Sequence, residues 1–124
     1  MAALTFDTFD EFALYIYIYI ANADGFIHIK EKESILAKLK KQYPTESDYE
    51  GLKRFKHMNK VYEDNIEDQD QTIKLNVEKF PNIRFTDKNK IFSDVYDIIN
   101  SDGIVDDRET EALNKLKKII EKVF

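Results

Sequence analysis

Two short segments of this chain carry the same acidic pattern, and each ends in a glutamate that could bind a cation. They cover residues 22–33 and 100–111, and both fit Asn-[Ala/Ser]-Asp-Gly-x-[Ile/Val]-x-x-[Lys/Arg]-Glu. Asp-Gly predicts a tight turn after a helix, because Gly adopts positive φ and Asp bonds its local backbone. The aliphatic residue two positions after the glycine should anchor this turn in the core. The glutamate then falls near the start of the next helix and faces back toward the turn.

The carboxylates of this pattern are hard oxygen ligands of the kind that Ca²⁺ and Mg²⁺ prefer. We therefore predict a divalent-cation site, with Zn²⁺ as a further candidate ion. The predicted metal ligands are Asp24, Glu31, Asp102 and Glu109. The accessory ligands predicted from the same loops are Asn22, His28, Asn100 and Asp106.

Helix capping alone could also account for these residues, since Asp favours turns and Glu accepts backbone N–H groups at a helix start. A degenerate calcium loop of the EF-hand type is a third interpretation. In the EF-hand frame Asp24, Gly25 and Glu31 would stand at positions five, six and twelve. The first ligand position falls on Ile20, and on Ile98 in the second copy, and neither side chain can coordinate an ion. An ordinary EF-hand is therefore disfavoured.

Helical spacing of apolar residues predicts an all-α fold. We expect helices over 8–25, 30–42, 87–100 and 107–123. Between the second and the last two of these, we expect a third helix that begins at about residue 45 and a fourth that ends at Phe80. The prediction is a single domain over 1–124, a bundle of about six helices. It contains two pseudo-symmetric helix-turn-helix units, near 8–42 and 87–123, and a helical insert over 45–80.

The stretch from Tyr15 to Ile20 leaves a competing interpretation. Tyr and Ile alternate there, which is a strand pattern in two residue types that favour sheets. The corresponding stretch before the second motif has Phe92, Val95 and Ile99 at helical intervals. We therefore expect a helix in both places, and the first one to be buried on nearly all sides.

Composition limits the class of protein. The chain has 124 residues, a net charge of −5 and no cysteine, which excludes disulfides and thiolate zinc sites. An acidic chain without a basic face argues against nucleic-acid binding. The apolar stretch before residue 24 is too short to span a membrane and lacks the basic flank of an export signal, so a cytoplasmic location is expected.

The two motif copies resemble the TerB-like family, named after the tellurite-resistance protein TerB. The matching residues are Asp24, Gly25, Ile27, Glu31, Asp102, Gly103, Val105 and Glu109. The resemblance covers both ends of the chain and leaves the middle, about 43–86, without a recognised motif. It implies an all-α fold with internal symmetry, divalent-metal binding, and a role in bacterial stress responses at the inner face of the membrane. The family is not known for enzymatic activity.

The sequence therefore predicts a non-enzymatic acidic binding module that responds to a divalent cation and recruits a protein partner. A metal-free adaptor that binds its partner through an acidic surface is the alternative from another class. A carboxylate-based enzyme is a third hypothesis. It is disfavoured because no nucleophile and base are paired in the sequence.

Overall fold

The computed structural model describes residues 3–80, 85–101, 103 and 107–123, with the side chains of 85–88, 122 and 123 left out. The predicted all-α fold of six α-helices is confirmed, and the described residues contain no strand. One 3₁₀ helix, η1, precedes the fourth helix. The elements are α1 (Phe9–Ala21), α2 (Ile29–Gln42), α3 (Asp48–Glu63), η1 (Ile66–Asp68), α4 (Gln69–Lys79), α5 (Phe85–Ile99) and α6 (Asp107–Val123).

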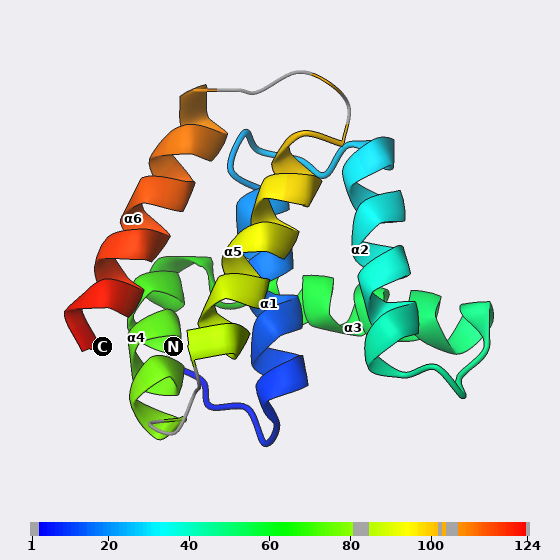
Figure 1. Cartoon of the computed structure of the whole chain (residues 1–124), viewed down its shortest axis with the longest axis horizontal. Helices are drawn as coiled ribbons and strands as arrows, with labels where there is room; N and C mark the ends of the chain where they lie inside the picture. The colour runs from blue at the N-terminus through cyan, green and yellow to red at the C-terminus, as the bar shows by residue number, and fades with distance from the viewer. Residues whose placement is uncertain (1–2, 81–84, 102, 104–106, 124) are drawn as a thin grey trace.

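Helix α1 is the centre of the bundle and packs against α2, α3, α5 and α6 (Figure 1). It begins after Thr8, whose side chain accepts a hydrogen bond from the backbone N–H of Glu11. Every residue from Phe12 to Ala21 is buried, so the Tyr-Ile alternation belongs to a helix covered on all sides. None of the described helices combines the length and the apolar character needed to cross a membrane.

The tyrosines of α1 carry hydroxyl groups into this core, and two of them donate hydrogen bonds to acceptors outside α1. Tyr15 donates to Asn65 Oδ1 at 2.7 Å, and Tyr17 donates to Asp94 Oδ2 at 2.6 Å. Burial raises the pKa of both phenols above the ordinary value, so they stay protonated at neutral pH. These bonds tie α1 to the α3–η1 turn and to α5.

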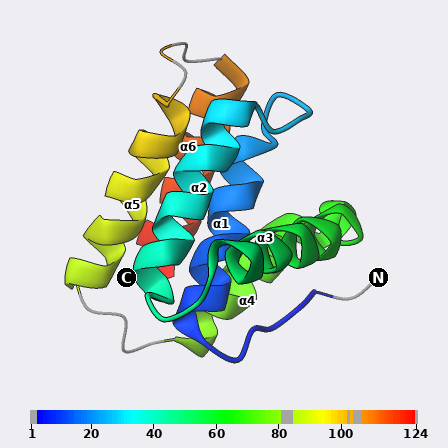
Figure 2. The ribbon, with the colours of Figure 1, turned by 90° about the vertical axis from the view of Figure 1, so that its right-hand side faces the viewer.

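The predicted insert is part of the same core. Helix α3 crosses the other helices at a steep angle (Figure 2), and α4 packs against α6. The side chains that α3 and α4 bury are apolar or aromatic for the most part. They include Phe55, Met58, Tyr62, Ile73 and Val77.

The N-terminal segment is bound to α4 through its backbone. The side chain of Asn76, which is fully buried, accepts from Phe6 N at 2.9 Å and donates to Leu4 O at 2.8 Å. Thr72 Oγ1 accepts from Leu4 N at 3.1 Å. Two side chains one turn apart on α4 thus satisfy the polar backbone groups of an extended segment.

Replacing Asn76 by Ala is expected to lower the free energy of unfolding by about 2–3 kcal/mol, because Phe6 N and Leu4 O lose their partners. Urea denaturation measures the loss, and hydrogen exchange at Phe6 should become faster. Asn114→Ala, at an exposed position of α6, is the matched control and should change stability by less than about 0.5 kcal/mol. Equal stability of the two variants would contradict this account of the N-terminal segment.

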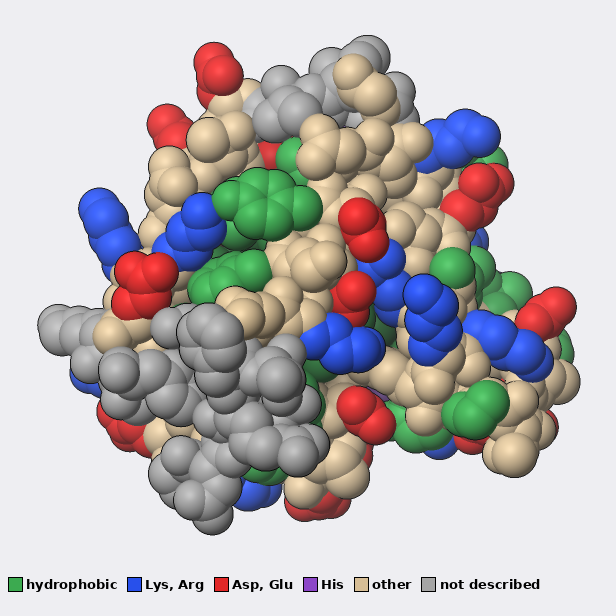
Figure 3. All heavy atoms as spheres, viewed as in Figure 1, with side chains coloured by type: hydrophobic (Ala, Val, Ile, Leu, Met, Phe, Trp, Pro, Cys, Tyr) green, Lys and Arg blue, Asp and Glu red, His purple; other side chains and the backbone are tan. Residues whose placement is uncertain are grey.

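The fold brings both acidic corners to one end of the bundle. The ends of α1 and α5 and the starts of α2 and α6 all lie at the top of Figure 1. On the face drawn in Figure 3, acidic and basic side chains are interspersed. The parts of both corners that the structure describes therefore share one end of the bundle.

Candidate functional site

The two corners repeat the same backbone hydrogen bonds where the structure describes both. Asn22 N donates to Ile18 O at 3.0 Å, and Gly25 N donates to Asn22 O at 2.9 Å. In the second copy, the matching bonds join Asn100 N to Tyr96 O at 3.0 Å and Gly103 N to Asn100 O at 3.1 Å. Both glycines have positive φ, 104° and 77°. The duplication in sequence is therefore also a duplication in backbone geometry.

The two asparagines that open the corners cap the preceding helices. Asn22 Nδ2 donates to Ile18 O at 3.0 Å, and Asn100 Nδ2 donates to Tyr96 O at 2.8 Å. Each amide thus satisfies a carbonyl in the last turn of its own helix. This gives the asparagines a structural task whether or not they also serve as accessory ligands.

Positive φ makes a clear prediction for the glycines. Gly25→Ala should lower the free energy of unfolding by about 1–2 kcal/mol, because a side chain strains the left-handed backbone even though a Cβ would meet no atom there. Gly51→Ala, inside α3 and also in open space, should raise it by up to about 1 kcal/mol. Thermal unfolding of both variants measures the contrast, and a shift of the same sign in both would contradict this explanation.

Asp24 and His28 form a contact at the first corner. Asp24 is buried, and its Oδ2 lies 2.6 Å from His28 Nε2. The ring of Phe26, which the sequence analysis did not single out, packs on the His28 ring with 4.3 Å between centroids. The one feature of the sequence that could have indicated Phe26 is its position directly after the Asp-Gly turn. Asp24 is therefore held by the loop and already has an imidazole partner.

Glu31 is the third residue of α2 and reaches back over the helix start. Its Oε1 accepts from His28 N at 3.0 Å, which satisfies one of the free N–H groups of the first turn. The side chain is fully buried, with 1% of the residue exposed. Its second oxygen, Oε2, is buried and accepts no hydrogen bond from an N–H or O–H group of the described residues. Capping thus explains one oxygen of Glu31 and leaves the other unexplained.

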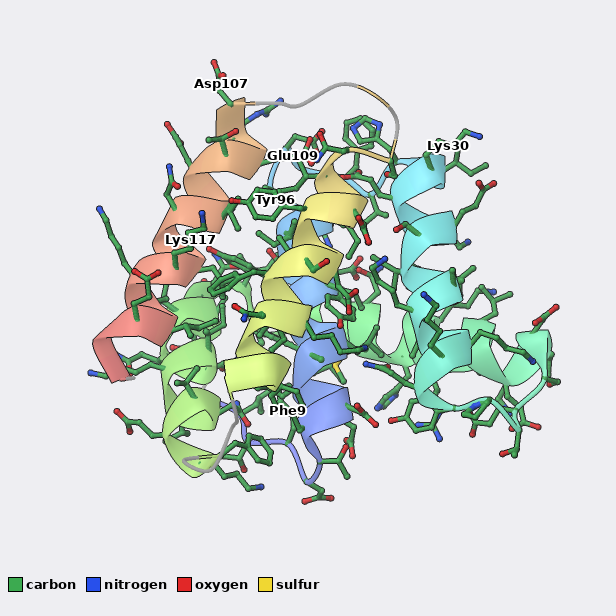
Figure 4. The ribbon with its side chains drawn as sticks, in the orientation of Figure 1. Phe9, Lys30, Tyr96, Asp107, Glu109 and Lys117 are labelled. Carbon is green, nitrogen blue, oxygen red and sulfur yellow. The ribbon has the colours of Figure 1, made fainter. Side chains whose placement is uncertain are left out.

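The neighbour of that carboxyl group is the glutamate of the other corner. Glu109 is the third residue of α6, is 2% exposed, and its side chain interacts with that of Glu31. Figure 4 shows Glu109 at the end of the bundle where α2 and α6 begin. Burial raises the pKa of Glu31, and the nearby charge of Asp24 adds to the rise, while the hydrogen bond from the His28 backbone and the interaction with the Glu109 side chain oppose it. Two acidic groups excluded from water cannot both be ionised cheaply, so a proton or a cation must accompany them.

The fold therefore joins Glu31 with Glu109 across the two copies and holds Asp24 and His28 beside them. Asp102 and Asp106, the other predicted acidic residues, lie outside the described residues. Within residues 3–80, 85–101, 103 and 107–123, no group of three or more His, Asp or Glu side chains has the arrangement of a metal site. The described part of the site thus contains two adjacent carboxyl groups, those of Glu31 and Glu109.

This geometry has chemical consequences. Both carboxyl groups are too deeply buried for an organic substrate to reach without rearrangement, whereas an ion or a proton is small enough. A pair of carboxylates with water completing the shell is a common way of binding Mg²⁺. Zn²⁺ would need a nitrogen ligand, and His28 Nε2 is engaged with Asp24.

A search of protein-family models, of curated proteins and of solved structures finds no match to this chain.

Proposed function

We propose that this protein is a non-enzymatic binding module that takes up one divalent cation between Glu31 and Glu109. The observation that carries the proposal is the unexplained oxygen of Glu31. That oxygen is buried, accepts no hydrogen bond from the described residues, and belongs to a carboxyl group that interacts with Glu109. A cation between the two groups would supply the positive charge that a buried pair of carboxylates requires.

The position of the pair suggests what the ion would do. Glu31 lies in the first turn of α2 and Glu109 in the first turn of α6, so an ion shared by them joins the two helix-turn-helix units. Without the ion, the ionised groups repel each other and favour separation of these helix ends. Cation binding would thereby fix the relative position of the two units, which is how the module could present a surface to a protein partner. The link to a bacterial stress response rests on the TerB-like resemblance alone.

Two oxygen ligands favour some ions over others. Mg²⁺ and Mn²⁺ keep several waters when they bind to proteins, whereas Ca²⁺ needs six to eight oxygen ligands. We therefore expect Mg²⁺ and Mn²⁺ to bind at the pair more readily than Zn²⁺.

Calorimetric titration of chelator-treated protein with MgCl₂, MnCl₂, CaCl₂ and ZnCl₂ tests the proposal. One site per chain is expected for at least one of the first two ions, together with a rise in melting temperature. Glu33→Gln, on the same helix at an exposed position, is the matched control and should bind as the parent does. No heat and no change in melting temperature at millimolar metal would remove the cation from the account.

A further inference from the structure

His28 contacts both acidic side chains of the first corner. Its backbone N–H donates to Glu31 Oε1 at 3.0 Å, and its ring Nε2 lies 2.6 Å from Asp24 Oδ2. It is also the N-cap residue of α2, where it forms a capping box with Glu31. The sequence predicts this histidine as an accessory ligand of the cation. Its contacts point to a different task in the same site.

The backbone bond of His28 decides which oxygen of Glu31 is available. The two oxygens of a glutamate exchange places when the carboxyl group rotates about its last torsion, which has little preference of its own. Because the N–H of His28 holds Oε1, rotation is restricted and Oε2 is left for other partners. Oε2 is the oxygen that is buried without a hydrogen bond from the described residues, and the Glu31 side chain interacts with that of Glu109. The bond thus selects the oxygen that an ion shared with Glu109 would use.

The ring of His28 is engaged on the side of Asp24. That aspartate is buried, with 8% of the residue exposed, and an ionised carboxylate only accepts hydrogen bonds, so the ring nitrogen Nε2 donates to it. A ring nitrogen that carries a proton has no lone pair for a metal ion. The Phe26 ring packs on the imidazole with 4.3 Å between centroids. These two contacts hold the ring, and therefore the residue whose N–H orients Glu31.

We propose that His28 is a positioning residue of the cation site and not one of its ligands, an inference that rests on the proposed function. Its N–H orients Glu31, so that Oε2 is free for an ion shared with Glu109. Asp24 keeps the imidazole away from the ion, which leaves oxygen ligands only. A site of this kind takes hard ions such as Mg²⁺ and Mn²⁺ in preference to ions that favour nitrogen.

Two substitutions of His28 isolate the N–H group. His28→Ala and His28→Pro both remove the ring, and only proline also removes the N–H. The φ of His28 is −72°, within the range that the proline ring imposes, so proline does not strain this residue. We expect His28→Pro to bind Mn²⁺ at least about tenfold more weakly than His28→Ala in calorimetric titration, the usual effect of losing a contact that orients a ligand. Equal affinities of the two variants would overturn the proposal.

The role of the ring is tested through its nitrogen atoms. His28→Gln keeps the N–H and a side-chain donor for Asp24, so it should bind Mn²⁺ about as tightly as the parent. Electron spin echo spectra of the Mn²⁺-loaded parent should be the same with ordinary histidine and with histidine labelled with ¹⁵N in the ring. A strong coupling that changes on labelling, or a large loss of affinity in His28→Gln, would identify His28 as a ligand and overturn the proposal.

His57 provides the matched control. It is the other histidine of the chain and stands at an exposed position of α3, so His57→Ala should bind Mn²⁺ as the parent does. Binding by the parent with the same affinity in every His28 variant would remove the positioning role and leave the cation site in place. No binding by the parent would remove the cation site and the positioning role together.

Hydrogen exchange of the parent protein gives a test that does not depend on the folding of His28→Pro. The amide proton of His28 should exchange slowly in chelator, because it is bonded to Glu31 Oε1 next to a buried carboxyl group. Its exchange should stay as slow or become slower in saturating MgCl₂, since the same bond orients Glu31 with and without the ion. Faster exchange in MgCl₂ would show that the ion draws both oxygens away from His28, and the proposal would then fail.

Discussion

Glu31→Gln is expected to weaken Mg²⁺ or Mn²⁺ binding by about 100-fold or more, since it removes one of two charged ligands. In the same variant, the metal-free protein should become more stable at pH 7. Gln keeps an oxygen that accepts from His28 N, so the start of α2 remains capped. The substitution also removes one of two buried acidic groups that interact with each other. The variant should therefore be more stable than the parent protein without metal, and less stable than the parent protein when metal is added.

The pH dependence of this effect has a defined sign. The pKa of Glu31 is raised in the folded protein above its ordinary value of 4.5, so between these two pKa values the folded chain binds more protons than the unfolded chain. The stability that the protonated group contributes is fully present below pH 4.5 and is lost as the pH rises through the folded pKa. The Gln variant does not titrate there. The two proteins should thus be similar in stability at pH 4 and differ most above the folded pKa of Glu31.

Urea denaturation at several pH values, in chelator and in saturating Mn²⁺, measures both effects. Glu33→Gln serves as control, because it makes the same change at an exposed position two residues away. If Glu31→Gln lowered stability by the same amount with and without metal, the glutamate would be a capping residue only, and the cation would have to be abandoned.

Ile16→Ala is expected to have the largest effect on folding. Ile16 is fully buried in the middle of α1, the helix that the other elements surround. Such a truncation costs about 2–5 kcal/mol through lost apolar contact and the cavity left behind. The total free energy of unfolding of a domain of this size is about 5–15 kcal/mol. The variant should therefore lose a large part of its stability, which equilibrium urea denaturation at 25 °C measures.

Leu75→Ala is the matched control for this prediction. Leu75 lies on α4 with 39% of its surface exposed, so the same truncation opens little or no cavity and should cost less than about 1 kcal/mol. A loss at Ile16 no larger than that at Leu75 would show that α1 is not the centre of the core.

The acidic corners could be predicted from the sequence because their signals are local. Asp-Gly sets a turn with positive φ, and Glu at the third helical position caps the helix start, so the backbone of both corners follows from neighbouring residues. The meeting of Glu31 with Glu109 follows from the symmetry of the two units and was only one of the arrangements that the sequence allowed. Its burial depends on α1, α2, α5 and α6 together, which no local pattern specifies.

The other features of the structure depend on tertiary packing. The Tyr-Ile alternation in α1 left its secondary structure open, because a helix buried on all sides has no polar face and shows no period of 3.6. A cavity of about 280 Å³ beside Tyr19 has no signal in the sequence, since residues of four helices, α1, α3, α4 and α6, line it. Likewise, the bonds from Asn76 to the N-terminal segment join residues about 70 positions apart.

A crystal structure of the protein grown with MnCl₂ tests the central claim most directly, because the anomalous signal of manganese locates the ion without reference to the protein model. We predict one strong peak between the carboxylates of Glu31 and Glu109, at about 2.1 Å from an oxygen of each. A crystal of metal-saturated protein in which these two side chains remain in contact, with no peak between them, would contradict the account.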